Sequence, residues 1–321
     1  MGGRALIALG GNALCGADQT GTYAEQHANA RAMVASIGEL VDTGWQVVVV
    51  HGNGPQVGAL AVQQEAAAAL VPAQPLFSLS AMTQGYLGSL IALALHERLG
   101  RGHQVVSVVT HVVVHGDDPA FTDPSKPIGP FYSVTEARKL AAERRWTTAE
   151  DAGRGFRRVV PSPEPLGILE ADTISKMVDA GMVVIACGGG GVPVAMSVDG
   201  YVGVDAVIDK DLAAERLASA LGVDALALVT NVPAVQLGHG TPRQRDLHEL
   251  GVDDAERHLA EGQFAAGSMG PKIAAAIRFI REGGEAVAIT TSTLLASTMS
   301  ATDGRPAGTL VTAASGRRVG R

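Results

Sequence analysis

Residues 45–58 read WQVVVVHGNGPQVG, and this stretch decides the fold class. Its four consecutive valines have no polar face, which is typical of a strand in a parallel sheet covered on both faces by helices. A Gly-Asn-Gly turn, Gly52–Gly54, ends the strand, and a helix follows through Glu65. This order of strand, glycine turn and helix indicates an α/β protein.

The same order recurs along the chain. We expect buried strands over Ala5–Leu9, Gln46–His51, Val105–Val114, Met182–Cys187, Ala225–Val229 and Ala286–Thr290. We expect helices over Tyr23–Asp42, Ala81–Leu99, Asp209–Leu221 and Met269–Arg281. The alternation predicts an open, mainly parallel sheet sandwiched by helices.

Residues 117–165 depart from this alternation. They are rich in proline and in charged side chains, and Glu150–Val160 within them is typical of a short hairpin. The chain has 321 residues, enough for two domains or for one large domain with a subdomain. We interpret residues 117–165 as an excursion or lid on one main body.

The composition excludes several classes of protein. Hydrophobic residues make up 46% and charged residues 18% of the chain, which excludes a disordered protein. The net charge of −7 argues against nucleic-acid partners and anionic membranes. The two cysteines, Cys15 and Cys187, form no CxxC or zinc spacing, as in reduced cytosolic proteins. Ala180–Val198 is uncharged, but its four glycines and a proline indicate two strands around a turn rather than a membrane span.

Three glycine clusters follow predicted strands. Gly10 and Gly11 follow the first strand, Gly52–Gly54 the second, and Gly188–Gly191 a later one. In open α/β sheets, ligands bind at the carboxyl ends of the strands, and glycine turns there present backbone N–H groups to anions. There is no P-loop motif. Gly52–Gly58 resembles the dinucleotide pattern GxGxxG with one residue too many, so a nicotinamide-binding oxidoreductase is an alternative.

Lysine is scarce, and three of the five lysines are informative. Lys210 and Lys272 are expected in the first turns of helices, where a positive charge opposes the helix dipole, so an anion is expected beside them. Lys126 lies in the proline-rich segment. Asp209 is interpreted as a helix cap, whereas Asp211 is placed to hold two lysines in position.

The histidines predict no metal site. His111 and His115 are four residues apart on a predicted strand, which separates them by about 13 Å. They therefore cannot share a metal ion, and we predict no metal-binding side chains.

Eight motifs resemble those of carbamate kinases, in the amino acid kinase superfamily. They are ALGGNAL (8–14), HGNGPQVG (51–58), AMTQG (81–85), KPIGPF (126–131), RVVPSP (158–163), CGGGGVP (187–193), AVIDKDL (206–212) and GSMGPK (267–272). The first motif is shared by the superfamily, whereas HGNGPQVG, KPIGPF and VVPSP together are specific to carbamate kinase. The resemblance extends from about residue 4 to Val311.

The resemblance implies one amino acid kinase domain over residues 1–321 with a protruding subdomain near residues 117–165. It implies a cytoplasmic homodimer that acts on small molecules and catalyses ATP + carbamate ⇌ ADP + carbamoyl phosphate, run toward ATP in arginine catabolism. The N-terminal part would hold carbamate, and the C-terminal part the nucleotide. Mg²⁺ would be held mainly by the nucleotide phosphates.

The resemblance also implies roles for individual residues. The catalytic residues would be Lys126, Lys210, Asp211 and Lys272. The substrate-binding residues would be Gly10, Gly11, Asn12, Gly52, Asn53, Gly54, Gly188, Gly189 and Gly190. The nucleotide-binding residues would be Lys210, Thr230, Ser268, Met269 and Lys272.

The chemistry of this reaction agrees with the residues present. Lysines and backbone N–H groups supply the positioning and charge neutralisation that phosphoryl transfer needs. Carbamate is already an anion at neutral pH, so no general base is required. Two alternatives remain on the same fold: another acyl-phosphate-forming kinase, such as N-acetylglutamate kinase, and a non-catalytic regulatory protein.

Overall fold

The computed structural model describes residues 2–10, 14–16, 19–144, 146–151, 153–265, 268–300 and 305–314. Within these residues the central sheet has eight strands. In spatial order they are β15 (Glu249–Gly251), β17 (Thr309–Thr312), β16 (Ala286–Thr290), β12 (Ala225–Val229), β1 (Arg4–Leu9), β2 (Gln46–His51), β9 (Val183–Ile185) and β3 (Val105–Ser107). The strands from β16 to β3 run parallel, and β17 pairs antiparallel with β16, so the predicted mainly parallel sheet is confirmed.

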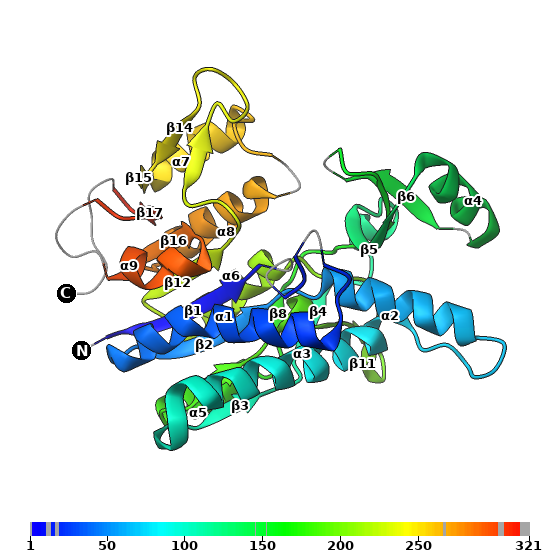
Figure 1. Ribbon diagram of the computed structural model, residues 1–321, viewed down its shortest axis with the longest axis horizontal. Coiled ribbons are helices and arrows are strands. Elements are labelled where there is room, and N and C mark those ends of the chain that lie inside the picture. Colours follow the sequence, from blue (N-terminus) through cyan, green and yellow to red (C-terminus); the bar gives the residue numbers. More distant parts are fainter. Residues whose placement is uncertain are drawn as a thin grey trace.

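Helices cover both faces of this sheet (Figure 1). One layer contains α1 (Tyr23–Asp42), α3 (Leu76–Leu99) and α9 (Leu295–Met299), and the other contains α5 (Ala171–Asp179), α6 (Lys210–Leu221) and α8 (Met269–Arg281). The remaining helices of the described residues are α2 (Gly54–Ala67), α4 (Val134–Arg144) and α7 (Val252–Ala260), with short turns η2 (Gly100–Gly102), η3 (Pro119–Phe121), η4 (Gly188–Gly190) and η5 (Ser292–Leu294).

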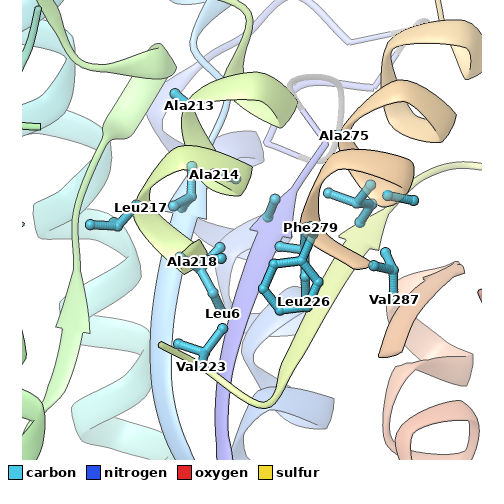
Figure 2. Packing of buried hydrophobic residues seen from close by; sticks show 14 of the residues in the cluster. Leu6, Ala213, Ala214, Leu217, Ala218, Val223, Leu226, Ala275, Phe279 and Val287 are labelled. Atoms are coloured by element: carbon cyan, nitrogen blue, oxygen red, sulfur yellow. The ribbon is translucent and has the colours of Figure 1, made fainter. Parts of the chain in front are cut away.

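Alternate residues of β1 explain the two layers. Leu6 and Ala8 pack in the cluster that contains α6 and α8, whereas Ile7 and Leu9 pack against α1 and α3. All four side chains are fully buried. Figure 2 shows the first of these layers, with the small side chains of α6 lying over Leu6. A strand buried on both faces needs no polar residue, which is why its sequence is a continuous apolar run.

A second sheet extends the body beside α3. It contains β11 (Gly200–Gly203), β10 (Val192–Ser197), β4 (His111–Val114) and β8 (Gly167–Ile168). The uncharged stretch 180–198 forms β9, the glycine turn η4 and β10, as predicted. Leu76–Gly102, which contains α3, is long and apolar enough to cross a membrane, but half of its apolar window is packed inside the protein, as in a core helix.

Three predicted boundaries were wrong. The single strand expected over Val105–Val114 is two strands, β3 and β4, in different sheets. The chain leaves the central sheet after Ser107, and the N–H and hydroxyl of Thr110 both donate to the Gln84 side chain of α3. The strand expected through Cys187 ends at Ile185, because Cys187 is left-handed with φ 47°. Helix α3 begins at Leu76, five residues before the predicted start.

Residues 117–165 contain a three-stranded sheet of their own and project from the body (Figure 1). Its strands are β5 (Lys126–Tyr132), β7 (Phe156–Val160) and β6 (Thr147–Glu150), and α4 packs against it. The predicted hairpin is present, because β6 and β7 pair antiparallel with Glu150 opposite Phe156. A small two-stranded ribbon, β13 (Val235–Leu237) with β14 (Arg245–Leu247), lies in the C-terminal half.

Helix α2 fixes this protruding segment to the body. Gly58 lies against β5 so closely that a Cβ atom there would be 1.9 Å from the backbone nitrogen of Gly129. Near the end of α2, Glu65 accepts hydrogen bonds from Arg144, Trp146 and Arg158 of the segment, at 2.5, 3.2 and 3.1 Å. The segment is therefore joined by backbone contact and by charge to the helix that begins at the Gly52–Gly54 turn.

Candidate functional site

The described glycines of the three turns lie at one edge of the central sheet. They follow β1, β2 and β9, which are neighbours in the sheet and parallel, so their carboxyl ends lie together. The N–H of Gly52, directly after β2, donates to the carbonyl of Leu9 at the end of β1, at 3.3 Å. Gly10 lies at the end of β1, whereas the predicted site residues Gly11 and Asn12 lie outside the described residues.

The second and third turns are in direct contact, and only glycine fits there. A Cβ atom at Gly188 would lie 2.4 Å from Nε2 of His51, and one at Gly189 would lie 2.1 Å from Nδ2 of Asn53. Asn53 is buried and donates to the hydroxyl of Thr83 on α3 at 2.9 Å. The glycines therefore let the turn after β9 pack on two polar side chains that follow β2.

His51 lies beneath this turn as a neutral imidazole. Its ring is fully buried, and Nδ1 lies 3.0 Å from the carbonyl oxygen of Gly52. Burial lowers the pKa of His51 to about 4, and the positive charge of Lys210 acts in the same direction. The sequence indicates no role for His51 beyond its motif.

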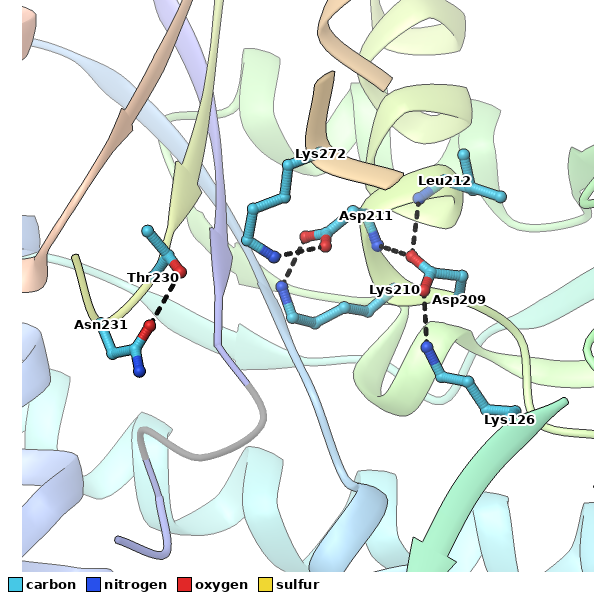
Figure 3. Close-up of polar contacts among 8 residues, drawn as sticks. All are labelled: Lys126, Asp209, Lys210, Asp211, Leu212, Thr230, Asn231 and Lys272. Atoms are coloured by element: carbon cyan, nitrogen blue, oxygen red, sulfur yellow. Dashed lines mark hydrogen bonds and ion pairs between the residues drawn. The ribbon is translucent and has the colours of Figure 1, made fainter. Parts of the chain in front are cut away.

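One carboxylate holds two lysines at the centre of the site. Oδ1 of Asp211 accepts from Nζ of Lys210 and Oδ2 accepts from Nζ of Lys272, both at 2.6 Å (Figure 3). The three side chains are at most 11% exposed. This is the contact that the sequence predicted for Asp211. We call Lys210, Asp211 and Lys272 the lysine cluster.

The electrostatics of the lysine cluster favour a further anion. Burial opposes ionisation of Asp211, but Lys210 and Lys272 outweigh it and hold the pKa of that carboxyl well below its usual value. Burial lowers the pKa of the Lys210 ammonium group, and Asp211 opposes this shift. Two ammonium groups and one carboxylate leave one net positive charge in a nearly dry site, where an anionic ligand gains most.

Two helix starts bring the lysine cluster together. Asp209 is the N-cap of α6, since Oδ1 accepts from the N–H groups of Asp211 and Leu212. Lys210 is the first residue of α6, and Lys272 lies in the first turn of α8. The two helices pack through small and apolar side chains, including Ala214 and Ala218 of α6 and Ala276 and Phe279 of α8. Close packing of these helices places both lysines on one carboxylate.

Lys126 reaches this region from the protruding segment. Its Nζ atom lies 2.5 Å from Oδ2 of Asp209, and both side chains are partly buried (Figure 3). The sequence predicted only a helix cap for Asp209. The cap is confirmed, but the second oxygen of the same carboxylate binds a lysine 83 residues away in the chain. No local signal indicates that contact, because it depends on how the segment folds back.

The residues predicted to bind a nucleotide lie in two places. Ser268 and Met269 begin α8, one turn before Lys272. Thr230 follows β12, where its N–H donates to the carbonyl of Thr290 and its hydroxyl faces Asn231 at 3.4 Å. In Figure 3 Thr230 lies apart from the lysine cluster. The structure therefore brings Ser268 and Met269 near the lysines and leaves Thr230 at the end of a separate strand.

Among the described residues, no group of three or more His, Cys, Asp or Glu side chains is arranged to hold a metal ion. His111 pairs instead with Glu170 at 2.7 Å. The carboxylate oxygens nearest the site, those of Asp209 and Asp211, are engaged by lysines and backbone N–H groups.

Known proteins share this sequence and this structure. The chain matches the model of the amino acid kinase family over residues 3–291. Carbamate kinase from Pyrococcus furiosus is 48% identical over 290 residues, covering 89% of this chain and 92% of that protein. The structure of carbamate kinase from Giardia lamblia bound to citric acid superposes with a TM-score of 0.92 at 38% identity, covering 97% and 98% of the two chains. The same enzyme bound to AMP-PNP has a TM-score of 0.86 at 39% identity, with the same coverage.

Proposed function

This chain belongs to the amino acid kinase family and, within it, to the carbamate kinases, and we propose that the lysine cluster carries its phosphoryl transfer. The protein is an ATP:carbamate phosphotransferase that interconverts ATP and carbamate with ADP and carbamoyl phosphate. The observation that carries the proposed role is the single carboxylate, Asp211, that holds two nearly buried lysines at 2.6 Å.

The two lysines would neutralise the oxygens of the moving phosphoryl group. In phosphoryl transfer the charge is spread over those oxygens, so the protein acts mainly by positioning and by electrostatic stabilisation. Asp211 fixes both ammonium groups before the substrates arrive, and the lysine cluster keeps one net positive charge for them. Lys126 would contact the same group from the protruding segment, which we propose acts as a lid.

The glycine turns would bind carbamate and the transferred phosphate. Backbone N–H groups at the ends of β1, β2 and β9 are suitable donors for anions. The proposed contacts are Gly10, Gly11, Asn12, Gly52, Asn53, Gly54, Gly188, Gly189 and Gly190. Carbamate attacks as an anion, so no base is needed, and this agrees with a His51 side chain that is buried beneath Gly188 and packed rather than exposed.

The C-terminal half would hold the nucleotide, with Ser268 and Met269 beside Lys272, and Thr230 farther from the phosphates. AMP-PNP bound to the Giardia lamblia enzyme supports a nucleotide site on this fold. Mg²⁺ would enter with the nucleotide and be held mainly by its phosphates, because the carboxylates of Asp209 and Asp211 are already engaged by lysines. The ion would supply positive charge that neutralises the phosphate oxygens.

We also propose that the enzyme is a cytoplasmic homodimer, as the resemblance implies. Its reaction would run toward ATP synthesis in arginine catabolism. Exposed apolar side chains on neighbouring elements support the dimer. Met196 and Tyr201 on the β10–β11 hairpin and Tyr86 and Leu93 on α3 are 40–69% exposed. Gly203 of the same hairpin lies against the ring of Phe77 on α3, so hairpin and helix form one surface. A dimer in sedimentation at micromolar concentration is expected, and a persistent monomer would contradict it.

The test is ATP formation from ADP and a phosphoryl donor with Mg²⁺. Carbamoyl phosphate, acetyl phosphate and N-acetylglutamyl phosphate are supplied in parallel. Fast turnover of carbamoyl phosphate alone is expected. Turnover of N-acetylglutamyl phosphate instead would indicate another acyl-phosphate kinase, and bound nucleotide without any turnover would indicate a regulatory protein.

A further inference from the structure

The Lys126–Asp209 pair joins two parts of the protein that carry different pieces of the proposed site. Lys126 is the first residue of β5, where the chain enters the sheet of the protruding segment. Asp209 caps α6, directly before the lysine cluster. Nζ of Lys126 lies 2.5 Å from Oδ2 of Asp209, and their side chains are 30% and 17% exposed.

Neighbouring contacts hold the segment at the same place. The N–H of Val207 donates to the carbonyl of Pro161, which follows β7, at 2.9 Å. Val207 also shares a small apolar cluster with Ile128 of β5 and Val160 of β7. Residues 207–209 therefore contact both strands through which the segment joins the body, and the ion pair is the charged part of this junction.

The other side of the segment belongs to α2. Glu65 binds Arg144, Trp146 and Arg158, and Gly58 packs on Gly129, so β5 and α2 are fixed together. Helix α2 begins at the Gly52–Gly54 turn, whereas α6 and α8 carry the lysine cluster. The Lys126–Asp209 pair is thus an ionic contact between the part that holds the substrate turn and the part that holds the lysine cluster, beside the pair of Glu164 with Arg278 of α8.

Charge explains why Lys126 needs a partner there. Lys126 carries the same charge as Lys210 and Lys272, so without a counterion it would be repelled from their vicinity. Its four-carbon chain also has many rotamers, and one strong contact removes most of that freedom. Asp209 supplies both the charge and the fixed point, because its other oxygen is held by the N–H groups of α6.

We propose that Asp209 is a positioning residue for the reaction, which holds Lys126 and the start of β5 beside the lysine cluster so that Lys126 meets the transferred phosphoryl group. The inference rests on the proposed function of Lys126. It assigns to Asp209 a role beyond capping a helix.

The main variant is Asp209→Asn. Asparagine keeps an oxygen that caps α6, but its amide group replaces the oxygen that binds Lys126. We expect kcat/KM for carbamoyl phosphate to fall by about ten- to a hundredfold, with a change of less than about twofold in KM for ADP and an unchanged Tm. Asp254→Asn is the matched control, because it removes an exposed carboxylate that pairs with Arg257 at 2.6 Å.

A double-mutant cycle separates positioning from a structural role. If Asp209 acts through Lys126, Asp209→Asn has no further effect on kcat/KM in the Lys126→Ala background. Asp209→Ala should lower the Tm as well, since it removes the cap. If Asp209→Asn fails to fold, Asp209→Ser replaces it, because serine is also a good N-cap without charge.

Two results would overturn the inference. One is an Asp209→Asn enzyme as active as Asp254→Asn. The other is an equal further loss when Asp209→Asn is added to Lys126→Ala. In both cases the wild-type enzyme still turns over carbamoyl phosphate, so the proposed function would stand while this inference fails.

Discussion

Asp209 and Asp211 lie two residues apart at the start of one helix, and each binds lysine, yet their surroundings differ. Asp211 is buried and holds two lysines from the packed helices α6 and α8. Asp209 is partly exposed and holds one lysine from a projecting segment. The first arrangement is a preorganised charge within the core, whereas the second is a contact between residues 83 positions apart in the chain.

The two aspartates of one motif therefore serve two purposes: Asp211 fixes buried lysines, and Asp209 holds the lysine of the projecting segment. A lysine fixed inside a dry site needs no reorganisation during the reaction, which is the most effective form of electrostatic stabilisation. A lysine on a projecting segment must be held by an added partner. Changes to the lysine cluster should therefore cost more than changes to the Lys126–Asp209 pair.

The largest effect is expected for Lys210→Ala. It should lower kcat by about two to three orders of magnitude, because in the proposed mechanism it removes a charge that stabilises the phosphoryl oxygens. The protein should remain folded, as judged by circular dichroism. Lys139→Ala, which removes an exposed lysine, is the control. Turnover near that of the wild type would show that Lys210 takes no part in the mechanism. The lysine cluster would then not differ in importance from the Lys126–Asp209 pair.

Acid should destabilise the folded protein through the buried His51 ring. The pKa of His51 is lowered to about 4 in the folded protein, against about 6.5 when unfolded. The unfolded state therefore binds a proton that the folded state does not, so stability falls as the pH drops from 6.5 to 4, by about 3 kcal/mol. Denaturant unfolding at several pH values measures this.

His51→Gln should flatten that pH dependence, and His239→Gln, at an exposed site, should leave it unchanged. An identical slope in all three proteins would show that His51 is not the group responsible. Its burial beneath Gly188 would then not keep the ring neutral.

Lys126→Ala should have an intermediate effect. We expect kcat/KM for carbamoyl phosphate to fall by about ten- to a hundredfold, with a smaller change for ADP, since Lys126 approaches from the segment rather than from α8. Steady-state kinetics with each substrate varied in turn measures the two losses. Equal losses for both substrates would mean that the segment has only a structural role and that Lys126 does not act on carbamoyl phosphate in particular.

The smallest effect is expected for Glu65→Gln, on the side of the segment remote from the lysines. Gln keeps one acceptor but loses the charge shared by Arg144 and Arg158, so the loss of stability should be about 1 kcal/mol. Limited proteolysis should be faster within residues 133–155. Glu143→Gln, in an exposed pair at 4.0 Å, is the control. Unchanged proteolysis would show that α2 does not fix the segment.

Much of the fold could be predicted because the relevant signals are local. The predicted bounds of α1, β2, β12, α8 and β16 are the observed ones, since each is a continuous apolar or amphipathic run ended by turn residues. The strand predicted over Val105–Val114 was wrong because an apolar run does not reveal that Gln84 binds Thr110 and redirects the chain. Periodicity cannot assign one run to two sheets.

The residues of the candidate site also divide into those that the sequence predicted and those that only the structure brings together. Scarce lysines at helix starts and glycines after strands pointed to Lys210, Lys272 and the three turns from the sequence. The sequence alone determined the α/β class, the family resemblance and the charge types of the site, because these depend on residue identity and spacing. Only the tertiary structure decided that Asp209 holds Lys126 and that Asn53 and His51 lie beneath the glycine turn, because those contacts join residues far apart in the chain whose meeting depends on packing.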